Sequence, residues 1–256
     1  MAASTILNVA YGPDAAQVMD VYLPVNRSAS TTRVIVMIHG GAWNQGDKTD
    51  MSQFVDSLHN RLPDFAVINI NYRLALTTAT LFPAQELDVK AALQFIVDHS
   101  SQYLISQKIA LIGASAGGHL ALLQGNKYSS PVRPKAIVSL FGPTDMTDMY
   151  NNPTNALVPA GLVAVIGKTP TQDATIYYNS SPINFVTTAS PPTIFLHGGM
   201  DHLVRYTQSQ NMKNLLQTAG INNQFVFYPL NGHGWTGADL TDSFIKIQAF
   251  LLANVN

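Results

Sequence analysis

The fold of this chain is indicated most clearly by KIALIGASAGGHLALL, residues 108–123. Residues 108–112 form an apolar strand pattern, residues 113–117 have the spacing G-x-S-x-G, and residues 118–123 are helix-like. A serine on such a strand-to-helix turn adopts a strained backbone, which requires small residues two positions before and after it. The turn pushes the Ser115 hydroxyl out of the end of the sheet. The free N–H groups and positive dipole end of the following helix then face any oxyanion that forms there.

The composition is typical of a globular protein and excludes several classes of function. The chain has 256 residues, of which 46% are hydrophobic, which is ample for a full core. The formal net charge is -1, so neither a nucleic acid nor an anionic membrane surface is an expected partner. There are no cysteines, which excludes disulfides, thiolate zinc sites and cysteine nucleophiles.

Signals for targeting are weak. Residues 1–5 carry no basic region and begin no long apolar core, so we expect no signal peptide. No apolar run approaches the ~18 residues of a membrane span. Charged residues make up only 11% of the chain, which weakly favours an exported mature form and leaves the compartment open.

Strand-like and helix-like segments alternate along almost the whole chain. This alternation predicts an α/β fold in one domain over residues 1–256, with a mostly parallel sheet of about eight strands and helices on both faces. Most strand patterns are continuous apolar runs, typical of strands buried on both faces. The expected strands cover residues 19–23 (antiparallel), 34–38, 65–70, 109–112, 136–140, 193–196 and 224–228, and the expected helices cover residues 84–99, 118–123, 206–219 and 240–252.

Residues 144–192 depart from this alternation. They are rich in Asn, Pro and Thr and contain one apolar stretch, residues 157–166. We interpret the segment as an excursion over the edge of the sheet that forms a small lid. An ordinary long connection with one helix is the alternative.

A glycine-rich stretch, His39-Gly40-Gly41-Ala42-Trp43, follows the second expected strand. Acyl transfer requires at least two N–H groups directed at the carbonyl oxygen as it becomes negative, and a glycine-rich turn lets the backbone approach a substrate. We expect Gly41 and Ala42 to supply such N–H groups together with Ala116, the residue after the serine. The histidine of the stretch is expected to hold this turn.

A base and an acid follow later strands. His233 lies between glycines after the last expected strand, where its imidazole can hang over Ser115 and take the hydroxyl proton. Asp201 follows the strand at residues 193–196, and its carboxylate would accept the imidazole Nδ1–H and fix the tautomer. The chain order Ser, Asp, His is the order found with G-x-S-x-G turns.

Other acids and a metal site are the alternatives at this end of the sheet. Asp145, which also follows a strand, is the main rival for the acid, and Asp173 is a weaker one. His197, Asp201 and His202 are close in sequence, but they lack the spacing of paired metal ligands, so we expect no metal. No glycine pattern for a phosphate or a dinucleotide occurs, so we expect no cofactor.

In combination, these motifs resemble the α/β-hydrolase superfamily, and specifically the small esterases whose oxyanion loop begins His-Gly-Gly. Residues 71–74 and 82–88 are similar to the strand end and helix start of hormone-sensitive-lipase-like esterases. Residues 11–13 and 20–24 are similar to the opening strands of the bifunctional feruloyl and acetyl-xylan esterase group. Ala42 replaces the third glycine of the lipase-like enzymes, and little precedes the first expected strand. Both departures favour the feruloyl and acetyl-xylan group.

The resemblance implies a serine carboxylic-ester hydrolase that acts through an acyl-enzyme at Ser115, with His233 and Asp201. Its expected partner is a small-molecule ester with a short, acetyl-type acyl group, such as an acetylated carbohydrate, or a feruloyl ester, and the chain is expected as a monomer or homodimer. Trp43 and Trp235 are expected to line the substrate pocket, and Trp43 to narrow it. The alternatives are an arylformamidase or peptidase-like amide hydrolase on the same residues and, from another class, a non-catalytic ligand-binding homologue.

Overall fold

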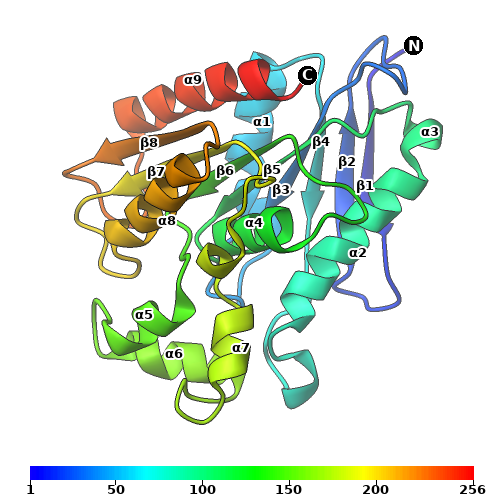
Figure 1. Cartoon of the computed structure of the whole chain (residues 1–256). Helices are drawn as coiled ribbons and strands as arrows, with labels where there is room; N and C mark the ends of the chain where they lie inside the picture. The colour runs from blue at the N-terminus through cyan, green and yellow to red at the C-terminus, as the bar shows by residue number, and fades with distance from the viewer.

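Eight strands form one twisted sheet in the computed structural model, which describes residues 1–256 (Figure 1). Their order across the sheet is β1-β2-β4-β3-β5-β6-β7-β8. β2 pairs antiparallel with β1 and β4, and all other neighbours are parallel, so the predicted mostly parallel sheet is confirmed. The strands are β1 (Ser4–Ala10), β2 (Val18–Leu23), β3 (Val34–Ile38), β4 (Ala66–Ile70), β5 (Ile109–Ala114), β6 (Ala136–Leu140), β7 (Thr193–Gly198) and β8 (Asn223–Tyr228).

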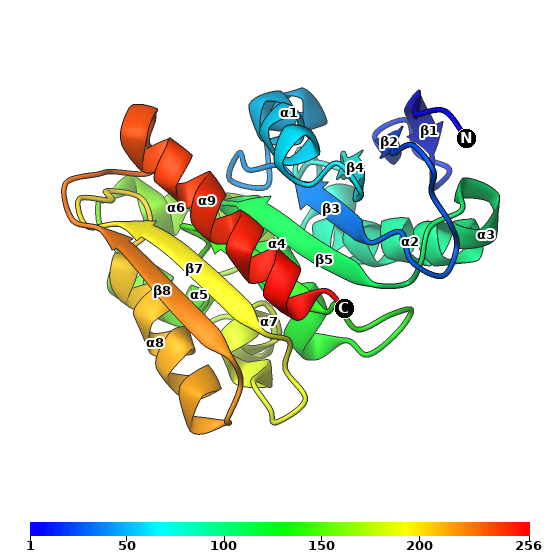
Figure 2. The ribbon, with the colours of Figure 1, turned by 90° about the horizontal axis from the view of Figure 1, so that it is seen from above.

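Helices cover both faces of the sheet, as predicted (Figure 2). α1 and α9 pack on one face, and α2, α4 and α8 pack on the other. None of the helices has both the length and the apolar character needed to cross a membrane. The helices are α1 (Ser52–Arg61), α2 (Ala84–Asp98), α3 (Ser100–Tyr103), α4 (Ala116–Lys127), α5 (Met146–Asn151), α6 (Leu157–Ile166), α7 (Ala174–Asn179), α8 (Tyr206–Thr218) and α9 (Gly237–Asn254), with short 3-10 turns η1 (Lys48–Met51), η2 (Thr78–Thr80) and η3 (Pro182–Phe185).

The central strands β3 and β5 are apolar throughout because each contributes to two cores. In β3, Val34, Val36 and Ile38 pack toward α2, α4 and α8. The alternate residues Ile35 and Met37 pack toward α1 and α9. Successive side chains of a strand point to opposite faces, so a strand covered by helices on both sides has no polar face.

Residues 144–192, called the cap segment below, form a separate layer beside one end of the sheet (Figure 1). The segment contains three short helices, α5, α6 and α7, joined by turns. The apolar stretch at residues 157–166 is α6, whose Val158, Leu162 and Val165 join the core on the α4 face. The segment is therefore a small lid, as interpreted from the sequence.

Several elements lie where no element was expected, and the two longest of them are β1 and α1. β1 is an edge strand, and its residues are largely exposed, so it lacks the apolar alternation of a half-buried strand. α1 buries only Val55 and Leu58 on its sheet-facing side, which is too sparse a pattern to stand out in ten residues. In both cases the element is stabilised by its contacts in the folded protein, which the local sequence pattern does not indicate.

Candidate active site

Ser115 lies on the tight turn between β5 and α4 with a strained backbone, φ +54° and ψ −119°. The backbone around Ser115 is packed so closely that the two flanking glycines of the motif could not carry a side chain. A Cβ atom on Gly113 would lie 2.1 Å from the carbonyl oxygen of Gly117, and a Cβ atom on Gly117 would lie 2.0 Å from the carbonyl oxygen of Ile38. Both glycines of the G-x-S-x-G motif are therefore required by close backbone contact, which fixes where the serine hydroxyl stands.

Three side chains from separate loops form a hydrogen-bonded chain. The Ser115 hydroxyl lies 2.8 Å from Nε2 of His233, and Nδ1 of His233 lies 2.7 Å from Oδ2 of Asp201. An ionised carboxylate only accepts hydrogen bonds, so Nδ1 carries the proton and Nε2 is left to accept from the serine. The loops that follow β5, β7 and β8 thus meet at one point, although the residues are 118 and 32 positions apart in sequence.

The carboxylate of Asp201 is fully enclosed and fully hydrogen-bonded. Its Oδ1 accepts from the N–H groups of Leu203 (2.8 Å) and Val204 (2.9 Å), while Oδ2 accepts from His233. Burial raises the pKa of this carboxyl, but hydrogen bonds from His197, His233 and Val204 outweigh burial and hold the pKa well below its usual range. Asp201 therefore stays ionised at neutral pH and well below it.

His197 is a second histidine on this carboxylate, and sequence reasoning considered it only as a metal ligand. It is fully buried, its Nδ1 accepts from the Ser209 hydroxyl at 2.8 Å, and its Nε2 donates to the Val204 carbonyl at 2.9 Å. The same Nε2 lies 3.2 Å from Oδ2 of Asp201. The position of His197 four residues before Asp201 was the sequence signal that could have indicated this contact. No group of three or more His, Cys, Asp or Glu side chains in residues 1–256 is arranged to hold a metal ion.

The two rival acids have other roles. Asp145 caps the N-terminus of α5, where its carboxylate accepts from the N–H of Asp148 at 2.9 Å. Asp173 caps α7 in the same way through the N–H of Ile176 at 3.1 Å. Neither carboxylate contacts the imidazole of His233, so Asp201 is the acid that faces it.

The glycine-rich loop after β3 turns its backbone through three consecutive positive φ angles, at Gly41 (+101°), Ala42 (+48°) and Trp43 (+62°). A Cβ atom on Gly41 would lie 2.1 Å from the carbonyl oxygen of Gln45, so only glycine fits there. The N–H groups of Gly41, Ala42 and Ala116 donate no hydrogen bond within the chain. They are therefore free to donate to a group bound beside the serine.

His39 holds this loop from below, as expected. Its ring stacks on Tyr72 with centroids 4.3 Å apart, and its Nδ1 donates to the Gly40 carbonyl at 2.7 Å. The Tyr72 hydroxyl donates to the carbonyls of His39 and Gly40. Burial lowers the pKa of His39, so the ring is neutral and structural.

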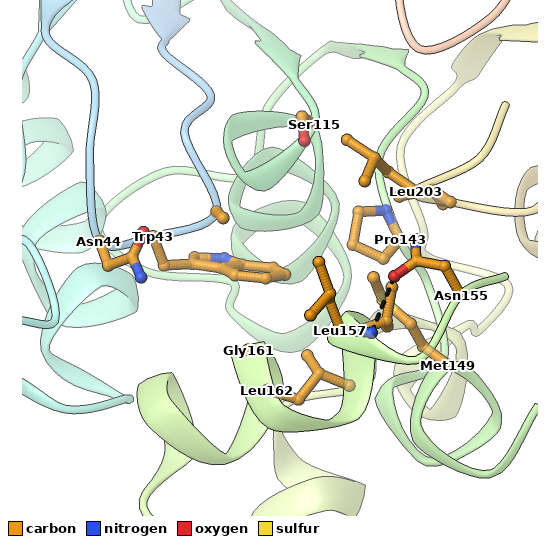
Figure 3. Close-up of a pocket in the computed structure, with 13 residues that line it drawn as sticks. Trp43, Asn44, Ser115, Pro143, Met149, Asn155, Leu157, Gly161, Leu162 and Leu203 are labelled. Carbon is orange, nitrogen blue, oxygen red and sulfur yellow. Dashed lines mark hydrogen bonds between the residues drawn. The ribbon is translucent and has the colours of Figure 1, made fainter. Parts of the chain in front are cut away.

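An apolar cavity of about 270 Å³ extends from Ser115 toward the cap segment (Figure 3). Trp43 forms one wall, and α6 forms the wall opposite the serine. Of the three residues with free N–H groups, Ala42 lines the cavity together with Ser115. The complete lining is Ala42, Trp43, Asn44, Ser115, Pro143, Met149, Asn155, Leu157, Val158, Gly161, Leu162, Leu203 and Val204. The sequence did not predict any of the cap-segment residues in this lining. The apolar run at residues 157–166 was the only signal that could have indicated them.

Trp43 joins the loop to both α4 and the cap segment. Its indole N–H donates to Nδ1 of His119 at 3.1 Å, and Nε2 of His119 donates to the Ser180 carbonyl at 2.7 Å. Burial lowers the pKa of His119 to about 4, so the ring is neutral and can accept at one nitrogen while it donates at the other. This relay fixes the orientation of the Trp43 wall.

Trp235 does not line the cavity, in contrast to the expectation from sequence. Its ring packs on Tyr228 and Phe141, with centroids 4.7 and 5.5 Å away, and its N–H donates to the Ser243 hydroxyl at 2.8 Å. These contacts draw the ring toward α9. Phe141 packs against the His233 ring, so Trp235 supports the imidazole loop from behind.

The model of the BD-FAE family matches residues 19–216, which is most of the chain. The chain belongs to the BD-FAE family. The resemblance to α/β-hydrolase esterases that the motifs indicated is thereby confirmed.

Individual relatives agree with this assignment. The structure of a truncated form of a carbohydrate esterase from gut microbiota is 29% identical, with a TM-score of 0.80 over 96% of each chain. A bifunctional GH43-CE of Bacteroides eggerthii is 30% identical, with a TM-score of 0.83 over 96% of this chain and 38% of that one. Esterase LipC of Mycobacterium tuberculosis is 27% identical over 91% of this chain. The chain spans 60% of the length of that curated relative.

Proposed function

We propose that this protein is a serine carboxylic-ester hydrolase in which Ser115 is the nucleophile. The hydrogen-bonded chain from the Ser115 hydroxyl through His233 to the ionised Asp201 is the observation that carries the proposal. It combines a nucleophile, a base and a group that orients the base, all within hydrogen-bonding distance. The esterase names of the relatives support ester cleavage as the reaction.

In the proposed mechanism, the Ser115 oxygen attacks the ester carbonyl while Nε2 of His233 takes its proton. Asp201 stabilises the imidazolium that results. The carbonyl oxygen becomes negative and accepts hydrogen bonds from the N–H groups of Gly41, Ala42 and Ala116. The intermediate then expels the alcohol, which receives its proton from His233. Water then gives a proton to His233 and attacks the acyl-enzyme. The intermediate that forms releases the acid, and His233 returns the proton to the Ser115 oxygen.

We propose short acyl groups, with acetyl as the smallest, on a carbohydrate or similar alcohol. The cavity beside Ser115 is apolar and is narrowed by Trp43, which suits a small apolar acyl group better than a long lipid chain. The likeness to a carbohydrate esterase over nearly the whole chain supports a sugar as the alcohol. We also propose that residues 1–256 act as one domain, since one sheet runs through them.

The proposal is tested by replacing the nucleophile. Ser115→Ala should lower kcat on p-nitrophenyl acetate by about 10⁶-fold, because no other hydroxyl can form the acyl-enzyme. A fluorophosphonate probe should label the wild-type protein at Ser115 and leave the variant unlabelled. Equal hydrolysis by both proteins, or no hydrolysis and no labelling of the wild type, would refute the proposed activity.

A further inference from the structure

The cavity lies on one defined side of the serine. Its lining includes Ser115 and Ala42 but not His233. During attack on an ester, the leaving oxygen must face Nε2 of His233 and the carbonyl oxygen must face the free N–H groups. The acyl substituent then points away from His233. The cavity is therefore on the side where the acyl group lies.

Gly161 occupies the middle of the wall that closes this space. One stripe of α6 faces the cavity, formed by Leu157, Val158, Gly161 and Leu162. Glycine in the interior of a helix weakens the helix relative to alanine. At Gly161 a Cβ atom would meet nothing within 4 Å, and φ is not positive, so neither packing nor backbone conformation requires glycine. The observable consequence of this glycine is the space it leaves in the cavity wall opposite Ser115.

The space in front of Gly161 is lined mainly by apolar side chains. Asn155 is one of two asparagines in the lining, and both ends of its amide are already engaged. Its Nδ2 donates to the His202 carbonyl at 2.7 Å, and its Oδ1 accepts from the N–H of Leu157 at 2.9 Å (Figure 3). The rest of the far wall consists of Met149, Leu162 and similar side chains, which offer no partner to a polar acyl group.

We propose that Gly161 sets the upper length of the acyl group that the enzyme accepts, an inference that rests on the ester hydrolysis proposed above. A cavity of about 270 Å³ is many times larger than the ~10–15 Å³ of cavity volume that one water molecule needs. Unbranched apolar acyl groups longer than acetyl therefore fit between Ser115 and α6. A side chain at position 161 shortens this space from its far end.

The test compares Gly161→Leu with the wild type and with Ala160→Leu on p-nitrophenyl acetate, butyrate, hexanoate and octanoate. Ala160 is the matched control because it is exposed on the same helix and does not line the cavity. For Gly161→Leu, the ratio of kcat/KM on hexanoate to kcat/KM on acetate should fall by at least about 10-fold, the scale for methylenes excluded from an apolar pocket. Ala160→Leu should keep the wild-type ratio, and Gly161→Ala should show a smaller decrease. The melting temperature of each variant reports whether α6 still folds.

A second series separates the two sides of the ester. Methyl, butyl and hexyl acetates vary the alcohol and keep the acyl group constant, so Gly161→Leu should leave the ratios within this series unchanged. A loss confined to the alcohol series, or an equal loss on all acyl lengths in a folded variant, would overturn the role of Gly161. Absence of hydrolysis by the wild type on every ester would instead refute the proposed function itself.

Discussion

The loops at the end of the sheet and the cap segment both surround Ser115, but different forces shape them. At the end of the sheet, glycine is required because backbone meets backbone, as at Gly113 and Gly117. In the cap segment, a Cβ atom on Gly161 would meet nothing within 4 Å, and the helix around it is held by apolar side chains packed on the core. The first region therefore fixes the position of the reacting groups, whereas the second leaves space whose size can change without disturbing them.

The two regions also differ in polarity. The end of the sheet holds a connected polar network in which Asp201 has every accepting position filled. The cap wall is apolar, and a few hydrogen bonds join the cap segment to the loops around Ser115. They include the relay from Trp43 through His119 to Ser180 and the bonds from Thr154 and Asn155 to the His202 carbonyl. The proposed chemistry and the proposed limit on acyl length thus lie in separate parts of the chain, and substitutions in each part should have different effects.

Of the variants below, Asp201→Asn should have the largest effect. This effect should be confined to the rate of the chemical step. The amide can still accept from the N–H groups of Leu203 and Val204, but its NH₂ then faces His233 and His197, both of which donate to the carboxylate. His233 would be driven into the wrong tautomer, with a loss of about 10⁴-fold in kcat. Steady-state kinetics on p-nitrophenyl acetate measures this loss. An Asp145→Asn variant is the control and should retain activity within a few fold.

Gly117→Ala and Gly161→Ala apply the same chemical change to the two regions. At position 117 the added methyl would lie 2.0 Å from the Ile38 carbonyl oxygen, so β3 and the loop after it must move, which we expect to lower the free energy of unfolding by about 3 kcal/mol. At position 161 the methyl meets nothing, and the higher helix propensity of alanine should raise the free energy of unfolding by up to about 1 kcal/mol. Urea unfolding measures the free energy of unfolding of both variants. Equal changes in this free energy would contradict the difference between the two regions.

Trp43→Phe should have a smaller effect than Asp201→Asn and Gly117→Ala, because it breaks only one of the hydrogen-bonded connections between the regions. The phenyl ring keeps most of the wall, but Nδ1 of the fully buried His119 loses its donor. An unsatisfied buried acceptor should lower the free energy of unfolding by about 2 kcal/mol. A double-mutant cycle with His119→Leu measures the coupling, and additive effects of the two substitutions would show that the relay contributes nothing.

The parts of the site that follow strands were predictable, and those that depend on packing were not. Ser115, Asp201 and His233 each follow an apolar strand, and the carboxyl ends of parallel strands share one edge of a sheet, so their meeting could be anticipated. The choice of Asp201 over Asp145 could not, because both carboxylates follow strands and only the loop conformations decide which one reaches the imidazole. Trp235 was expected in the pocket, but its contacts with Tyr228 and Ser243 hold it outside the lining.

The sequence alone determined the order of the strands along the chain, the strained serine turn and the residue types able to perform acyl transfer, because these depend on local periodicity and on glycines spaced around one serine. Tertiary structure decided how α6 lies against Ser115, where the cavity opens and which histidine supports Asp201. These features arise from contacts between segments far apart in the chain, and nothing in the local pattern of either segment specifies the other.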